Sequence, residues 1–513
     1  MELDLRERPF TEPRSRLLVM AADDGSLWVA RALYETPPTE AAVLTGLRVF
    51  AGDRELAVRR ALPWRVDFDE GVTLAFADPD TLVLSTTCGG TFRVVWDGGS
   101  ASLGDSLTLV GQGSFDPETV LAAAEARWRD WLARMPAVPE DLQDIAETAW
   151  WTLGVNILHI QGGQALVPAK NGYVGLWNWD ALFHAVGLRH GHPGLAREQI
   201  RLLLAHQRPD GQLPDVIHDH GVLAETADLP RSDIERMDRH VGGGAPRDPV
   251  PVTKPPLAAW AVWKVHEAAP DPAFLAEVYE PLVRAQRWWF ACSDPDGDGL
   301  AEYLHPYSSG LDDSPIWDLG PRAEPPDLNS YLALQADCLA DIADALGRRE
   351  EAARWRRDAQ ALVDLMVARR WSGDRFVTLS GGRVADVRTP LELMPLVTGR
   401  LPGPVADRLV ADLTSPSFWA PVPSVAFDDP RFDPEAMWRG PVWLNVNHLL
   451  IEGLHRSGHP DVADRLAGRV LAMVRDGGGL YEYWNPLTGA RAKRAAAGFG
   501  WSAALFLDLA AGR

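Results

Sequence analysis

The pattern of apolar and polar positions divides the chain into two parts, with the change near residue 117. Before this point, short runs alternate apolar and polar residues with a period of two, which is typical of strands with one buried face. Turn-forming residues such as Asp97-Gly98 separate the runs. We therefore predict an antiparallel β-sandwich domain over residues 1–116. Its expected strands are Ser15–Ala21, Leu27–Tyr34, Glu40–Phe50, Val72–Phe76, Thr81–Ser85, Thr91–Trp96 and Ser106–Val110.

After Asp116-Pro117, apolar residues recur at spacings of three, four and seven, which is the pattern of helices. We expect a linker helix within residues 117–137 and a catalytic domain of about twelve helices over 138–513. The expected helices are 139–160, 178–190, 194–207, 256–268, 271–291, 328–346, 349–370, 391–398, 404–413, 436–457, 460–475 and 499–511. Twelve helices can close as six hairpins, so the predicted fold class is mainly α: an (α/α)6 barrel with an N-terminal antiparallel β-sandwich. A stacked solenoid is the alternative, although no fixed-period repeat is visible.

Composition and charge narrow the possible functions. Hydrophobic residues make up 46% of the 513 residues, which is enough for a large core. The formal net charge is −21, and no run of Lys or Arg is present, so neither nucleic acid nor a membrane surface is an expected partner. Without an apolar leader or a bilayer-length apolar run, a cytoplasmic protein is the simplest expectation. The oligomeric state is left open.

Metal and disulfide chemistry are not expected. The three cysteines form no CxxC pair, which favours buried free thiols. The spacing of Asp294, Asp296 and Asp298 resembles the start of a calcium loop, but position twelve of such a loop falls on His305 rather than on Glu. A tight turn is the preferred interpretation, so we predict no cofactor, with calcium possible but unsupported.

Carboxylates stand beside aromatic residues in several segments that join the expected helices. Tryptophan faces can stack on sugar rings, and carboxylates can accept hydrogen bonds from sugar hydroxyls, although 21 tryptophans can also serve a large core. The alternative for each segment is a turn, a helix start or a part of the core. The candidate substrate-binding residues in these segments are Tyr173, Trp177, Trp179, Asp180, Gln212, Asp215, Asp313, Trp317, Trp438, Arg439, Trp443, Tyr481 and Trp484.

Taken together and in this order, the motifs of residues 138–513 resemble glycoside hydrolase family 63 and its bacterial relatives, which include processing α-glucosidases and mannosylglycerate and glucosylglycerate hydrolases. The resemblance implies an (α/α)6 barrel that hydrolyses an α-glycosidic bond with inversion. The family's acid loop reads here Ser309-Gly310-Leu311-Asp312-Asp313-Ser314-Pro315, which makes Asp312 the general acid. The late Y-E-x-Y/W-N/D-P motif makes Glu482 the general base. The W-x-W-D and W-R-G-P-x-W elements line the family's sugar pocket, and they map to Trp177, Trp179, Asp180, Trp438, Arg439 and Trp443.

An inverting mechanism sets a geometric expectation for this pair. One carboxyl protonates the leaving oxygen while the other deprotonates a water on the far face of the sugar, so the carboxyls of Asp312 and Glu482 should lie about 6.5–9.5 Å apart. Asp180 is then a hydroxyl-binding residue. Lys254 stands where the glycerate-glycoside hydrolases tend to carry Gln, so it is a candidate for binding an anionic or differently placed hydroxyl group. The Gly- and Pro-rich segment 219–251 is a candidate lid.

The expected substrate is a small carbohydrate or glycoside, such as an α-glucoside, an α-mannoside or a glycerate glycoside. Two enzyme classes on similar barrels remain as alternatives. A phosphorylase would use phosphate in place of water and would lack the catalytic base, and a sugar epimerase would use paired histidines. A carbohydrate-binding protein without activity is a third alternative, which the retained acid and base disfavour.

Overall fold

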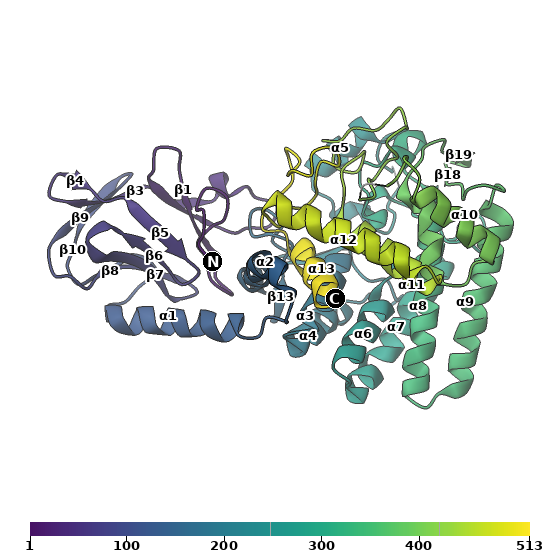
Figure 1. Cartoon of the computed structure of the whole chain (residues 1–513), viewed down its shortest axis with the longest axis horizontal. Helices are drawn as coiled ribbons and strands as arrows, with labels where there is room; N and C mark the ends of the chain where they lie inside the picture. Colours follow the sequence, from purple (N-terminus) through teal and green to yellow (C-terminus); the bar gives the residue numbers. More distant parts are fainter. Residues whose placement is uncertain (247, 420, 513) are drawn as a thin grey trace.

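The computed structural model describes residues 1–246, 248–419 and 421–512 (Figure 1). The strands gather at the N-terminal end of the molecule, and the helices form a larger body beside them. Helix α1 (Pro117–Leu132) runs along the strands toward the helical body. Asp116 caps this helix by accepting a hydrogen bond from the Thr119 N–H, and Pro117 occupies its first turn. No helix in the described ranges is long and apolar enough to cross a membrane.

The N-terminal strands form two antiparallel sheets, as predicted. One has the order β1-β2-β3-β9-β10, with β4 beside β3, and the other has the order β11-β8-β7-β6-β5. Alternation along β3 buries Leu47 and Val49 and leaves Arg48 at the surface. The strands are β1 (Leu17–Ala21), β2 (Leu27–Arg31), β3 (Ala42–Ala51), β4 (Arg54–Glu55), β5 (Val58–Leu62), β6 (Arg65–Phe68), β7 (Val72–Asp78), β8 (Thr81–Thr86), β9 (Phe92–Trp96), β10 (Gly99–Leu103) and β11 (Ser106–Val110).

The helices form two concentric rings, which excludes the solenoid. Within the described residues, the inner ring closes because each member packs against the next and α13 packs against α3. The inner members are α3 (Asn178–Leu188), α6 (Ala258–Ala268), α8 (Pro326–Ala345), the 3-10 helix η7 (Pro390–Thr398), α11 (Leu444–Arg456) and α13 (Gly500–Ala511). The outer members are α2 (Gln143–Val155), α4 (Pro193–Ala205), α7 (Pro272–Cys292), α9 (Arg349–Arg370), α10 (Gly403–Leu413) and α12 (Pro460–Gly477).

Burial explains which helices lie inside. Every residue of α3 is buried, whereas α12 buries only one stripe that includes Ala463, Leu466 and Val470. The contact that closes the ring depends on Gly187 of α3, because a Cβ atom there would lie 2.4 Å from the Cα atom of Ala504 in α13. A larger residue at this position would push the two helices apart.

Several boundaries differ from the sequence-based expectation. The helix expected over 139–160 ends at Val155, and residues 157–160 form a strand instead. The helix expected over 436–457 begins only at Leu444, because Val442 pairs with Trp484 in an isolated bridge. Strands β4, β5, β6 and β10 were not expected, since charged residues interrupt the alternation in β4, β5 and β6, and β10 consists mainly of small residues. The segment 219–251 contains a helix, α5 (Arg231–His240).

Short two- and three-stranded sheets lie among the loops of the barrel. They contain β12 (Ile157–Ile160), β13 (Gly163–Leu166), β14 (Leu176–Trp177), β15 (Val216–His218), β16 (Gly221–Leu223), β17 (Ala323–Glu324), β18 (Leu379–Ser380) and β19 (Arg383–Val384). All of these strands pair antiparallel. They fix the loops at the barrel rim by backbone hydrogen bonds.

The structure shows the surroundings of the three cysteines and of the acidic turn with Asp294, Asp296 and Asp298. All three cysteines are free, but Cys88 and Cys292 are exposed, which corrects the expectation of buried thiols. The carboxyl oxygens of Asp294, Asp296 and Asp298 lie within 4.8 Å of one another. Asp294 accepts hydrogen bonds from two backbone N–H groups, and Asp298 is paired with two arginines of α9. These contacts satisfy the acidic groups within the chain itself.

Candidate active site

The candidate site lies at one end of the barrel, where the loops that precede inner helices converge. Tyr173 comes just before α3, Lys254 before α6, Asp312 before α8, Met437 before α11 and Glu482 before α13. The positive ends of the inner helix dipoles therefore face this end of the barrel, which favours carboxylates and other electron-rich groups there. Residues up to 309 positions apart in sequence meet in this way.

Three adjoining cavities share Tyr173, Asp312 and Met437. The smallest, here called the cleft, has a volume of about 70 Å³, and half of the residues that line it are aromatic. A first chamber of about 680 Å³ adjoins both Asp312 and Glu482. A second chamber of about 660 Å³ adjoins Asp312 but not Glu482. The site thus has a narrow aromatic cleft with two larger spaces beside it.

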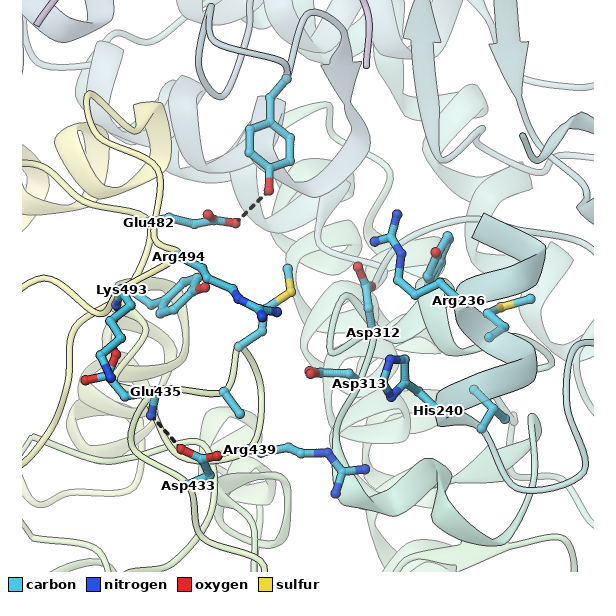
Figure 2. Close-up of a pocket in the computed structure, with 17 residues that line it drawn as sticks. Arg236, His240, Asp312, Asp313, Asp433, Glu435, Arg439, Glu482, Lys493 and Arg494 are labelled. Carbon is cyan, nitrogen blue, oxygen red and sulfur yellow. Dashed lines mark hydrogen bonds between the residues drawn. The ribbon is translucent and has the colours of Figure 1, made fainter. Parts of the chain in front are cut away.

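Asp312 and Glu482 face each other across the first chamber, from loops on opposite sides (Figure 2). Glu482 is 4% exposed and accepts two hydrogen bonds. The Tyr173 hydroxyl donates to its Oε1 atom at 3.2 Å, and the Ala496 N–H donates to its Oε2 atom at 3.2 Å. By contrast, the buried Oδ1 atom of Asp312 has no hydrogen-bond partner among the described residues. One carboxyl group is therefore held by donors, and the other keeps a free oxygen.

Both carboxyl groups are poised to titrate near neutral pH. Burial raises the pKa of Asp312 to about 6, against the opposing effect of Lys254. Burial also raises the pKa of Glu482 to about 7, although the Ala496 N–H and the Tyr173 hydroxyl favour its charged form. Each carboxylate also disfavours ionisation of the other, so the pair holds one proton over part of the neutral range.

Tryptophans form the wall of the cleft. The rings of Trp438 and Trp443 stack with centroids 3.6 Å apart and planes 6° apart. Trp179 packs against Trp438 and meets Trp501 edge to face at 5.6 Å. Asp180 lines the same cleft, and burial raises its pKa well above the usual range. Apolar faces beside a buried carboxyl group suit one sugar ring with its hydroxyls.

Charged residues fasten the surrounding loops to one another. Lys254, which is 7% exposed, pairs with Asp215 at 2.8 Å and donates to the Tyr307 carbonyl at 2.7 Å. The ammonium group that the sequence offers as a ligand contact thus binds two protein groups. Asp313 accepts a hydrogen bond from the Trp438 N–H at 2.9 Å, which joins the two loops on either side of the first chamber.

Other expected residues reach the cavities as well, and four do not. Tyr173, Trp177, Asp215 and Arg439 all line one of the cavities, and Arg439 pairs with Asp318. The four that do not are Gln212, Trp317, Tyr481 and Trp484, and each of these side chains makes contacts within the fold.

The contacts of these four side chains show how the fold uses them. The Gln212 amide donates to the carbonyls of Ala224 and Val252, and the Trp317 indole N–H donates to the Leu311 carbonyl. Trp484 is fully buried, and Tyr481 packs against it beneath Arg491. None of the four lines any of the three cavities.

Sequence reasoning also missed several lining residues. Arg236 and His240 reach the first chamber from α5, and Arg494 reaches it from the loop after Glu482 (Figure 2). These residues follow no motif in the sequence, although Arg236 and His240 lie within the segment 219–251 that the sequence offers as a candidate lid. Tyr34 of the β region lines the second chamber, and nothing in its sequence surroundings indicated this.

Comparison with known proteins places the chain in a family. Residues 173–502 match the family described as "Mannosylglycerate hydrolase MGH1-like glycoside hydrolase domain". The mannosylglycerate hydrolase MGH1 of Selaginella moellendorffii is 27% identical over 415 residues, which cover 68% of this chain and 82% of that protein.

Solved structures agree with this match. The GH63 mannosylglycerate hydrolase of Thermus thermophilus, in complex with glucose, superposes with a TM-score of 0.59 at 25% identity, covering 71% of this chain and 99% of that one. A bacterial glucoamylase complexed with acarbose has a TM-score of 0.59 at 10% identity over 99% of this chain and 94% of its own, which indicates a shared fold only. The chain therefore belongs to the MGH1-like glycoside hydrolases and is a hydrolase of the GH63 type.

Proposed function

We propose that this chain hydrolyses an α-glycosidic bond with inversion, with Asp312 as the general acid and Glu482 as the general base. The observation that carries the proposal is the pair of desolvated carboxyl groups facing each other across one cavity, beside an aromatic cleft. An inverting glycosidase needs this arrangement, because the acid and the base work on opposite faces of the sugar.

Hydrogen bonding supports the assignment of the two roles. Glu482 accepts two hydrogen bonds, which stabilise the carboxylate form that a base requires. The Oδ1 atom of Asp312 has no partner among the described residues, so it is free to carry a proton and donate it to a leaving oxygen. The raised pKa values alone would put the shared proton on Glu482, at about 7 against about 6. The assignment of the roles therefore rests on the hydrogen-bond geometry and on the position of each residue in the family's motifs, and not on these pKa values.

The proposed reaction proceeds in one displacement. A sugar ring occupies the cleft against Trp438 and Trp443, with Asp180 accepting hydrogen bonds from its hydroxyls. Glu482 removes a proton from a water molecule, whose oxygen forms a bond to the anomeric carbon. The bond to the leaving oxygen breaks as Asp312 gives that oxygen its proton, and the product has the opposite anomeric configuration.

The substrate proposed at this level is an α-glucoside or an α-mannoside. It is supported by the names of the relatives, which include mannosylglycerate and glucosylglycerate hydrolases. The narrow cleft has room for no more than one sugar ring, so the enzyme is expected to remove one terminal sugar residue.

The test is a hydrolysis screen with the purified chain. The panel contains α-glucosyl and α-mannosyl fluoride, α-linked disaccharides of glucose and mannose, and the α-glucosyl and α-mannosyl glycosides of glycerate. Proton NMR in the first minutes identifies the product anomer, and we expect the β-anomer. Initial release of the α-anomer would contradict inversion, and turnover that requires added phosphate would indicate a phosphorylase.

A further inference from the structure

The second chamber has walls from two parts of the molecule. Trp28 and the loop after β2, with Tyr34 and Glu35, come from the β region, while Asp233 and Arg236 come from α5. The remaining wall belongs to the barrel loops. The alignment with the Thermus enzyme covers 99% of that chain but only 71% of this one, so about 150 residues here have no counterpart in that enzyme. The β region therefore extends the site with residues that the family match, over 173–502, does not contain.

The position of the chamber indicates what it binds. It adjoins Asp312 but not Glu482, whereas the cleft adjoins both. In an inverting glycosidase the leaving group lies beside the acid and the attacking water beside the base. A space that touches only the acid is therefore on the leaving-group side of the scissile bond.

We propose that the second chamber binds the leaving group, that this group is an uncharged polyhydroxyl unit such as a second sugar ring, and that Tyr34 and Glu35 of the β region help to recognise it. This inference rests on the proposed function and deepens it. It assigns to the β region a role in choosing the substrate.

The charges in the chamber disfavour an anionic leaving group. Its two cations are already paired, Lys254 with Asp215 and Arg236 with Asp233. No further cationic side chain lines the chamber in the part of the chain that is described. Glu35 adds a carboxyl group, so a carboxylate ligand would meet paired cations and extra negative charge. Hydroxyl groups, in contrast, can both donate to carboxylates and accept hydrogen bonds.

Unsatisfied polar atoms mark places where such hydroxyls can bind. The Tyr307 hydroxyl is buried at the chamber and has no hydrogen-bond partner among the described residues, and the same holds for the Asp312 Oδ1 atom, which is proposed to meet the oxygen of the leaving group itself. Buried polar atoms in proteins are normally paired, so these two are available for a ligand. A chamber of about 660 Å³ also exceeds the needs of a three-carbon group, since pockets of about 300–1,000 Å³ hold much larger molecules.

The β-region wall is fixed in place. The Tyr34 ring stacks on His218 with centroids 4.3 Å apart and planes 10° apart, and it lies 5.8 Å from Trp177. Glu35 adopts a left-handed backbone conformation with φ of 48°, and its N–H donates to the Gly172 carbonyl at 3.0 Å. A residue other than Gly adopts this conformation at an energetic cost, and such strained residues cluster at functional sites.

The experiment compares leaving groups in variants of this wall. Tyr34→Ala and Glu35→Gln are assayed beside Glu40→Gln, a control at an exposed glutamate of the same loop that lies outside the three cavities. The substrates are the preferred α-linked disaccharide, the corresponding α-glycosyl fluoride and the corresponding glycerate glycoside. Fluoride is too small to use the chamber, so its release reports on the cleft and the carboxyl pair alone.

We expect the wild-type protein to prefer the disaccharide to the glycerate glycoside. Tyr34→Ala and Glu35→Gln should lower kcat/KM for the disaccharide by about tenfold or more, chiefly through KM, as the loss of one pocket contact does. Fluoride hydrolysis should change less than about twofold, and Glu40→Gln should match the wild type throughout. If Tyr34→Ala does not fold, the same comparison is made with Glu35→Gln and Trp28→Ala.

Two results would overturn the inference while leaving the proposed function intact. One is a wild-type preference for the glycerate glycoside, and the other is an equal loss of disaccharide and fluoride hydrolysis in both wall variants. Failure of the wild-type protein to hydrolyse any substrate, fluoride included, would overturn the proposed function and this inference with it.

Discussion

Replacing the two carboxyl groups one at a time should separate the acid from the base. In the proposed mechanism, Asp312→Asn removes the proton that the leaving oxygen needs, and Glu482→Gln removes the group that activates water. Both replacements keep the shape of the side chain, so the cavity is preserved. Because fluoride departs without a proton, an α-glycosyl fluoride needs the base but not the acid.

The expected magnitudes follow from the environment of each group. General acid or base catalysis contributes about 10²–10⁴-fold, which corresponds to roughly 3–5 kcal/mol of barrier. Asp312→Asn should therefore lose about 10²–10⁴-fold on a disaccharide and less than about tenfold on the fluoride. Glu482→Gln should lose about 10²–10⁴-fold on both substrates. The Tyr173 hydroxyl, which can also donate to an amide oxygen, should keep the Gln side chain in place.

The assay is steady-state hydrolysis of both substrates, with fluoride release followed by an ion-selective electrode. Asp130→Asn serves as the matched control, because this aspartate lies on α1 with a side chain that is 71% exposed. A thermal melt of each variant shows whether folding is intact. Equal losses on both substrates for Asp312→Asn would refute its role as the acid, and fluoride hydrolysis at a normal rate by Glu482→Gln would refute the role of the base.

Three further replacements test how the site is held together. Tyr173→Phe removes a hydrogen bond to the charged form of Glu482, so its pKa of about 7 should rise and the acidic limb of the pH–rate profile should move up by about one pH unit. Lys254→Met leaves Asp215 buried without its cation and should lower the free energy of unfolding by about 3–5 kcal/mol, measured in urea, with partial recovery when Asp215→Asn is added. Trp443→Ala removes a stacked ring from the cleft and should raise KM for the fluoride by about tenfold or more, which initial rates measure.

Much of the fold could be predicted because its signal is local. In an amphipathic helix such as α12, apolar residues recur every three or four positions. This pattern predicts both the type of element and the face that is buried. The missed strands β5 and β6 lack this regularity, since β5 contains two adjacent arginines at the surface of its sheet. β5 pairs with β6, and β6 pairs with β7. This pairing, rather than an alternation of apolar and polar residues, makes the segment form strands.

The sequence does not tell which aromatic residues line the cavities. The sequence around a tryptophan does not tell whether its side chain faces a cavity, as that of Trp443 does, or the core, as that of Trp317 does. The direction of the side chain depends on packing between loops that are distant in sequence. Tyr34 is the clearest case, because it reaches the second chamber only through the placement of the β region against the barrel.

The same contacts that join distant loops also set the chemistry of the site. Tyr173, before the first inner helix, binds Glu482, before the last, so the two ends of the ring are fastened where the ring closes. Across the first chamber, Asp313 holds the Trp438 backbone beside Asp312. These cross-connections keep water-excluding aromatic walls close to both carboxyl groups, and desolvation by such walls is the largest cause of the raised pKa of each. Removing one of these hydrogen bonds should therefore change the pKa values of the two carboxyl groups as well as the shape of the site. For this reason, the pH–rate profile of Tyr173→Phe is a more sensitive probe of the site than the stability of this variant.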